Sequence, residues 1–321
     1  MAEGALNGLL VIDKPGLDKT GNGSGQLPTS HDVVQRVRRW SRQRRIGHTG
    51  TLDPMASGVL VLCLGSATRL VEYYQGHDKE YTARVTLGTD TDTYDALGQA
   101  VATHPMGPLD GTVVEAALAR FRGEIEQCPP IYSALKQGGE SLHRKARRGE
   151  DVTVEARPVT THALELLSLE PPTDIWLRVV CSAGFYVRSL AFDIGETLGT
   201  GGHLSYLRRE SAGLFSVAQA HTLAAVEEAA QSGDLPDLLV APGVGLTLPR
   251  LRLDSKSSLR LGQGQRVWLP ASLSDFVYDT ANPIAQAVDD DGLLLGIVRV
   301  LEESTERGGG LLCKAEKWLA V

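Results

Sequence analysis

Residues 47–64 read GHTGTLDPMASGVLVLCL, a polar loop that runs directly into an unbroken apolar segment. The glycines, threonines and Pro54 of 47–58 prevent regular structure, whereas 58–64 predicts a buried strand. Pro54 biases Asp53 towards an extended backbone. A carboxylate held on a loop by a rigid scaffold is typical of a catalytic group. For this segment alone, an Asx turn or a helix cap is the alternative explanation of Asp53.

Upstream of this loop the sequence predicts an amphipathic helix. Val33, Val37 and Trp40 recur on one face, and Ser30 or Asp32 is expected to cap the helix start. The other face and the following turn carry arginines with no acid before Asp53. A solvated helix face is the ordinary explanation of such a cluster, and phosphate binding is the alternative.

Strand and helix patterns then interleave along the chain. Alternation predicts a half-buried strand from Tyr81 to Leu87, and further strands are expected at 159–169 and 175–181. The period changes to that of a helix at 190–198, which ends at Gly199. We therefore expect an α+β fold built on a mixed sheet.

The chain divides into two expected domains. Residues 1–247 form the first, and it contains a Gly-rich insertion at 16–27 that predicts a flexible surface loop. Residues 248–321 form a small, mainly β domain with a hairpin around the acidic turn at 289–292.

Composition excludes several classes of protein. The 321 residues carry a net charge of −7, which on its own argues against a nucleic-acid partner. Apolar runs are too short for a membrane span, and the N-terminus lacks the pattern of a signal peptide. The four cysteines form no Cys-x-x-Cys pair, so neither zinc nor disulfides are indicated. Asp90, Asp92 and Asp95 do not have the spacing of a calcium loop. A cytoplasmic protein without metal or cofactor is expected.

Two further segments carry candidate site residues. If the strand at 175–181 continues through 185–188, Tyr186 and Arg188 project on the same side. A guanidinium beside Asp53 keeps that carboxylate ionised and orients it. Tyr81 opens its strand, where its ring can stack on a base. Taken singly, each aromatic residue is better explained by core packing.

The sequence resembles the TruB family of tRNA pseudouridine synthases, which convert uridine 55 in the T-loop of tRNA to pseudouridine. The resemblance is collinear over about residues 7–215. Its segments are GLLVIDKP (8–15), GHTGTLDP (47–54), GSATR (65–69), KEY (79–81), LGTDTDT (87–93), PIYSALK (130–136), GFYVRSL (184–190) and HLSYLRR (203–209).

The resemblance implies a pseudouridine synthase fold with a mixed, mainly antiparallel central sheet flanked by helices, followed by a small PUA-like domain. It makes Asp53 the catalytic aspartate, Arg188 its ion-pair partner and Tyr81 the ring stacked on the flipped uracil. Tyr186 and Leu207 then lie in the pocket wall, and His48 lies beside the displaced nucleotide. The insertion at 16–27 and Phe185, where threonine is common, depart from the family pattern.

The resemblance also places an RNA-binding thumb at 127–151. The expected RNA contacts are His48, Lys14, Arg36, Arg39, Arg42, Arg44, Arg45, Lys136, Arg144, Lys145, Arg147 and Arg148. The arginines concentrate before the catalytic loop and in the thumb, whereas much of the acidic excess lies towards the C-terminal half, so the distribution of charge outweighs the acidic total.

The expected partner is the T-stem-loop of tRNA, with no membrane and no obligate protein partner, and the expected state is a monomer. Because the product is an isomer, no cofactor is required. The alternatives are a non-catalytic tRNA-binding or tRNA-folding protein on the same scaffold and, more weakly, an RNA glycosylase.

Overall fold

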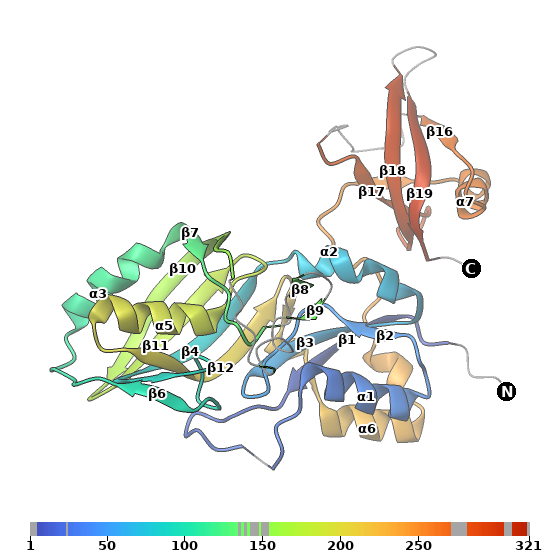
Figure 1. Ribbon diagram of the computed structural model, residues 1–321. Coiled ribbons are helices and arrows are strands. Elements are labelled where there is room, and N and C mark those ends of the chain that lie inside the picture. The colour runs from blue at the N-terminus through green and yellow to red at the C-terminus, as the bar shows by residue number, and fades with distance from the viewer. Residues whose placement is uncertain are drawn as a thin grey trace.

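The computed structural model describes residues 5–23, 25–133, 136–137, 140–141, 148, 154–270, 281–304 and 310–319. They form a large sheet covered by helices and a smaller sheet near the C-terminus (Figure 1). Within these ranges, no helix is both long and apolar enough to cross a membrane.

The large sheet has ten strands in the order β14-β1-β3-β12-β4-β11-β10-β7, with β2 paired to β3 and β13 to β12. Its pairings are antiparallel except β1 with β14 and β3 with β12, so the predicted mixed, mainly antiparallel sheet is confirmed. The strands are β1 (Gly8–Lys14), β2 (Ile46–His48), β3 (Ser57–Leu64), β4 (Lys79–Leu87), β7 (Gly123–Gln127), β10 (Arg157–Glu170), β11 (Asp174–Cys181), β12 (Gly202–Ala212), β13 (Phe215–Ser216) and β14 (His221–Thr222).

Helices cover one face of this sheet. In Figure 1, α1 and α6 lie next to each other beside β1 and β3, whereas α3 packs on β10 and on α5, and α5 packs on β12 and β4. The helices are α1 (Ser30–Ser41), α2 (Val71–Gln75), α3 (Gly111–Leu118), α5 (Val187–Leu198) and α6 (Leu223–Ser232). Short 3₁₀ helices are η1 (Gly65–Leu70), η2 (Ala119–Phe121), η3 (Val217–Gln219) and η4 (Leu235–Leu238). Two small ribbons are β5 (Thr89–Thr91) with β6 (Ala100–Thr103), and β8 (Lys136–Gln137) with β9 (Glu140–Ser141).

The smaller sheet has five strands in the order β15-β17-β18-β19-β16. Asp289 closes the β17–β18 turn, where its carboxylate accepts from the backbone of Asp291 and Leu293, so the predicted hairpin is confirmed. The elements are β15 (Arg250–Arg252), α7 (Ser255–Gly262), β16 (Val267–Pro270), β17 (Ile284–Val288), β18 (Leu294–Ser304) and β19 (Gly310–Trp318). The predicted division of the chain at residue 248 stays a prediction.

Strands β1 and β3 are buried on both faces. On the helix side, Leu10 and Leu62 belong to the core that includes residues of α1, α3 and α5. On the other side, Leu9 and Val61 share a second apolar cluster with residues of the smaller sheet, including Ile297. Burial on both faces explains why 58–64 is continuously apolar rather than alternating.

Two local expectations need correction. Thr29, not Ser30 or Asp32, caps α1; its side chain and that of Asp32 form a capping box. The stretch 185–188 is not extended, because Tyr186 is the N-cap of α5 and the helix begins at Val187. The reason is that the buried Val187, Leu190 and Ile194 have helical spacing and face the core.

In the middle of the sheet, the backbones of β3 and β12 approach each other closely. Parallel pairing joins β3 and β12 at Ser57 with Arg208 and at Gly58 with Arg209. Gly58 has a φ of +101°, and a Cβ atom there would collide with the carbonyl oxygen of Arg209. Only glycine satisfies both constraints.

We therefore expect Gly58→Ala to lower the free energy of unfolding by about 2–4 kcal/mol, from the positive φ and the backbone collision together. Urea unfolding measures this loss. The matched control is Gly107→Ala, whose Cβ meets nothing within 4 Å. Equal stability of the two variants would contradict the constraint.

Candidate active site

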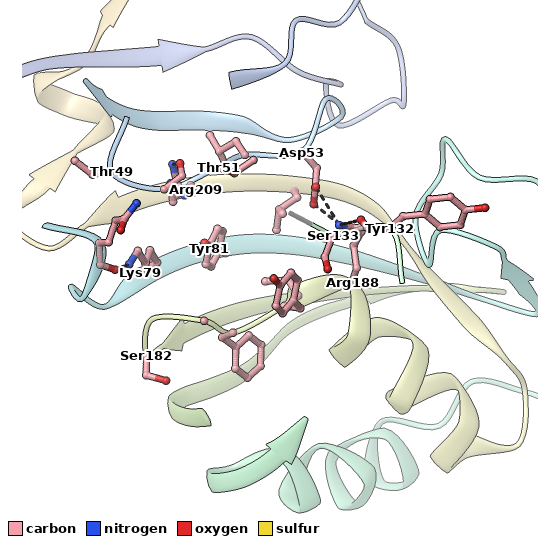
Figure 2. A pocket seen from close by; sticks show the side chains of 18 residues that line it. Thr49, Thr51, Asp53, Lys79, Tyr81, Tyr132, Ser133, Ser182, Arg188 and Arg209 are labelled. Atoms are coloured by element: carbon pink, nitrogen blue, oxygen red, sulfur yellow. Dashed lines mark hydrogen bonds and ion pairs between the residues drawn. The ribbon is translucent and has the colours of Figure 1, made fainter. Parts of the chain in front are cut away.

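A cavity of about 460 Å³ lies where the loop at 49–53, β4, β12 and the start of α5 meet. Figure 2 shows the side chains that line it, with the Asp53 and Arg188 pair on one side of Tyr81 and Lys79 and Arg209 on the other. The cavity brings together five residues predicted for the site, namely Asp53, Tyr81, Tyr186, Arg188 and Leu207.

Asp53 and Arg188 form a bidentate ion pair. Arg188 Nε donates to Asp53 Oδ2 at 2.9 Å, and Nη2 donates to Oδ1 at 3.1 Å. The Arg188 side chain is 5% exposed, whereas that of Asp53 is 30% exposed and reaches the cavity. A fork of two charge-assisted hydrogen bonds fixes the plane of the carboxylate.

Arg188 is itself held by other segments of the chain. Its guanidinium donates to the carbonyl oxygens of Thr93 and Tyr132, each at 3.1 Å. Asp95 lies 3.8 Å from Nε on a side chain that is 8% exposed. Burial raises the pKa of Asp95. The hydrogen bond from Thr93 and the charge of Arg188 both oppose this rise. These contacts fix the guanidinium from several segments of the chain.

The loop that carries Asp53, residues 49–56, is fixed from two directions; we call it the Asp53 loop. Ser30 Oγ donates to the Leu52 carbonyl at 3.0 Å and accepts from the Leu52 N–H at 2.8 Å. Ser30 therefore anchors the loop to the first turn of α1 instead of capping the helix.

Lys14 holds the other side of the Asp53 loop, and its assignment as an RNA contact is wrong. Its side chain is fully buried, and Nζ donates to the carbonyl oxygens of Pro15, Pro54 and Ala56 at 3.0, 3.1 and 2.7 Å. Burial lowers its pKa to about 8, and the charge of Asp53 partly offsets this shift. A buried ammonium that is satisfied by three carbonyls has no surface for a phosphate.

Tyr81 presents a ring to the cavity from β4. The side chain is 8% exposed, and burial raises its pKa. Tyr186 lies across the pocket, where Gln127 accepts from its backbone N–H at 2.7 Å and donates to its carbonyl at 3.0 Å. These two rings and Leu207 make an apolar slot that suits a planar group.

The remaining predicted residues lie around this cavity. His48 is half-buried in β2 and does not line the cavity; its Nδ1 has no hydrogen-bond partner within the described structure. The arginines of α1 and the following turn are exposed at positions 36, 39, 42, 44 and 45. Arg148 is exposed, whereas Arg144, Lys145, Arg147 and the Lys136 side chain lie outside the described residues.

Sequence reasoning missed three charged residues of the site. From the sequence, Asp95 is considered only as a calcium ligand, and neither Lys79 nor Arg209 is assigned to the cavity that both of them line. Their only signal was that they lie in or beside the segments LGTDTDT, KEY and HLSYLRR. Among the described residues, no group of three or more His, Cys, Asp or Glu is placed to hold a metal ion.

Chemically, this site combines an oriented carboxylate with an aromatic slot in one pocket. Such a carboxylate can attack an electrophilic carbon or stabilise positive charge on it, and the slot can stack a planar ring.

Comparisons with known proteins agree with this geometry. Residues 38–187 match the model of the TruB family pseudouridylate synthase N-terminal domain, and residues 188–242 match the tRNA pseudouridylate synthase B C-terminal domain. A protein of Arthrobacter sp. (strain FB24) named tRNA pseudouridine synthase B is 39% identical, covering 91% of this chain and 92% of its own. A protein of the same name from Burkholderia mallei (strain NCTC 10247) is 43% identical, covering 94% and 96%. A chain from the crystal structure of a Cbf5-Nop10-Gar1 complex superposes with a TM-score of 0.73 at 25% identity, covering 98% of this chain and 85% of that one.

The buried Lys14 predicts a pH-dependent stability. Its pKa falls from 10.5 to about 8 on folding. The native protein thus releases this proton at lower pH than the unfolded chain, and the contribution of Lys14 to the free energy of unfolding rises between pH 8 and 10.5. The full rise is about 3 kcal/mol.

Urea unfolding of wild type and Lys14→Met across this pH range isolates the effect, because the variant lacks the rise. Lys256→Met, which removes an exposed lysine, serves as the control, and its free energy of unfolding should show the same rise with pH as the wild type. Parallel pH profiles for wild type and Lys14→Met would contradict the buried ammonium.

Proposed function

This chain belongs to the TruB family of pseudouridylate synthases, and from that premise we propose that it isomerises uridine 55 in the T-loop of tRNA to pseudouridine, with Asp53 as the catalytic carboxylate. The observation that carries the assignment of Asp53 is its bidentate pair with the buried Arg188 inside the aromatic slot.

The reaction breaks the N1–C1′ bond of uridine, turns the uracil and forms a C5–C1′ bond. A carboxylate assists the first step by attacking C1′ or by stabilising its positive charge, as in retaining glycosidases. Addition of Asp53 to C6 of the base and a glycal route are the other two chemical possibilities. In each route Arg188 orients Asp53, and bound RNA must exclude water from the pocket so that isomerisation does not end in hydrolysis.

The target base must leave its stack to enter the cavity. Flipping costs a few kcal/mol. Stacking of the uracil on Tyr81 returns about 1–3 kcal/mol, and contact with Tyr186 and Leu207 adds to it. The apolar part of the slot therefore supplies binding energy, while Asp53 and Arg188 supply the chemistry.

Phosphate contacts supply most of the remaining affinity. We assign them to the exposed arginines of α1 and the turn after it, at positions 36, 39, 42, 44 and 45, and to the basic residues of the segment 127–151. We further propose a cytoplasmic protein, in keeping with four cysteines that are free thiols, and a monomer.

A tRNA-binding protein without catalysis is not favoured. RNA binding alone does not require a carboxylate that a buried arginine orients in the same cavity as two aromatic rings.

Asp53→Asn tests the assignment of the catalytic carboxylate. The amide neither attacks carbon nor stabilises positive charge, so we expect pseudouridine formation on a T-stem-loop RNA to fall by about 10⁴-fold or more. The measurement is nucleoside analysis after digestion, without added metal or cofactor.

The matched control is Asp290→Asn, which removes an exposed carboxylate in the β17–β18 turn and leaves the rate unchanged. Binding of the T-stem-loop persists in Asp53→Asn. Full activity of Asp53→Asn would overturn its role, and release of free uracil by the wild type would point to a glycosylase.

Salt dependence tests the arginine surface. We expect tRNA affinity to fall steeply with KCl concentration. The variant Arg39→Gln/Arg42→Gln/Arg45→Gln should reduce the slope of log K against log [salt] by about 0.7–0.9 for each phosphate that the protein no longer neutralises. Filter binding over a KCl series measures this slope.

The comparison is Arg250→Gln/Arg252→Gln/Arg260→Gln, which removes exposed arginines of the C-terminal part and keeps the wild-type slope. Affinity that does not change with salt, or equal slopes for both triple variants, would exclude this surface.

A further inference from the structure

Arg209 is a buried cation in the cavity wall that the mechanism above does not use. Its side chain is 3% exposed and lines the cavity together with Lys79. Among the residues that the structure describes, no carboxylate forms an ion pair with either of them within 4.0 Å. A buried charge without a counter-ion is costly, so its presence in a reaction cavity calls for an explanation.

Backbone contacts hold Arg209 in place without neutralising it. Nε donates to the Val59 carbonyl at 2.6 Å, and Nη2 donates to the Gly50 carbonyl at 3.1 Å. Burial raises the pKa of the Tyr81 hydroxyl, and the nearby charge of Arg209 opposes that rise. The charge is therefore fixed at the hydroxyl end of the ring on which the base is proposed to stack.

The two sides of the cavity differ in charge. On the Asp53 side, the charged group that reaches the cavity is a carboxylate; its partner Arg188 also lies near Asp95, and the Lys14 ammonium is buried beneath the loop. On the other side of Tyr81, Arg209 and Lys79 make the wall positive (Figure 2). The Lys79 ammonium donates to the carbonyl oxygens of Gln75 and His77, which fix it in the wall.

This polarity matches the charge separation of the reaction. When the N1–C1′ bond breaks, its electron pair stays on the uracil, and negative charge spreads over N1, O2 and O4 while C1′ becomes positive. Attack on C6 instead moves electrons to O4, and the glycal route also expels the uracil anion. In each case the pyrimidine becomes negative, and the later C5–C1′ bond returns that electron pair while C5 loses its proton and N1 gains one.

Resting on the proposed function, we propose that Arg209 is a catalytic residue that stabilises the negative charge of the uracil ring, with Lys79 adding to the positive potential of the same wall. A fixed cation aimed at developing charge needs no reorganisation during the reaction, and loss of one such donor costs about 10²–10³-fold in rate.

The alternative is a positioning role, because Arg209 bonds both to the Asp53 loop at Gly50 and to β3 at Val59. The variant Arg209→Gln keeps a hydrogen-bond donor and removes the charge. Arg209→Lys keeps the charge but cannot make both guanidinium hydrogen bonds, to the Val59 and Gly50 carbonyls. Arg208→Gln is the matched control, since the neighbouring Arg208 pairs with Asp13 and does not line the cavity.

The experiment compares two T-stem-loop RNAs, with uridine or 5-fluorouridine at the target position, in single-turnover assays that follow loss of the starting nucleoside. Fluorine stabilises the pyrimidine anion, so a missing cation matters less for this substrate. We expect Arg209→Gln to slow the uridine reaction by about 10²–10³-fold and the 5-fluorouridine reaction by at least 10-fold less. Arg209→Lys recovers part of the uridine rate, and Arg208→Gln keeps the wild-type rate on both RNAs.

Because the ratio of the two rates is measured within each variant, partial loss of stability cancels. Equal slowing on both RNAs, or an Arg209→Lys rate no higher than that of Arg209→Gln, would overturn the charge role and leave a positioning residue. A wild type that forms no pseudouridine would instead refute the proposed function itself.

Discussion

The ion pair between Asp53 and Arg188 connects most of the parts of the site. The Arg188 guanidinium donates hydrogen bonds to Asp53, to the Thr93 carbonyl in the segment after β5, and to the Tyr132 carbonyl in the segment after β7. Because Arg188 lies in the first turn of α5, the pair also fixes the start of that helix beside the cavity. Segments that are distant in the sequence thus meet at one planar group whose fork permits only one orientation of the carboxylate.

The remaining contacts explain how an exposed carboxylate stays oriented. Ser30 fixes Leu52, Lys14 fixes Pro54 and Ala56, and Asp53 lies between these anchored residues. The loop geometry is therefore set when the chain folds rather than when RNA binds. Pre-organisation of this kind lowers the cost of reaching the reactive arrangement.

Sequence reasoning predicted the sheet, the Asp53 loop and the five residues of the pocket, because local patterns and the family resemblance both carry that information. It failed where burial decides the role of a charge. Lys14 resembles a surface cation in the sequence, yet strand pairing buries it beneath the Asp53 loop. Asp95 and Arg209 come from segments far from Asp53, and only the pairing of β12 with β3 and β4 brings Arg209 to the cavity. The start of the helix at 187 was predicted too late, because its first apolar residue was assigned to the preceding strand.

The second apolar cluster, which Leu9 and Val61 share with Ile297 and Leu319, links the two sheets. Residues of η1, α2 and β13 belong to the same cluster, so the C-terminal part covers only a share of the back of β1 and β3. Loss of that part would leave exposed apolar surface on the larger sheet, and contiguous apolar surface of this kind favours association between chains. The C-terminal part therefore protects the rest of the chain from aggregation.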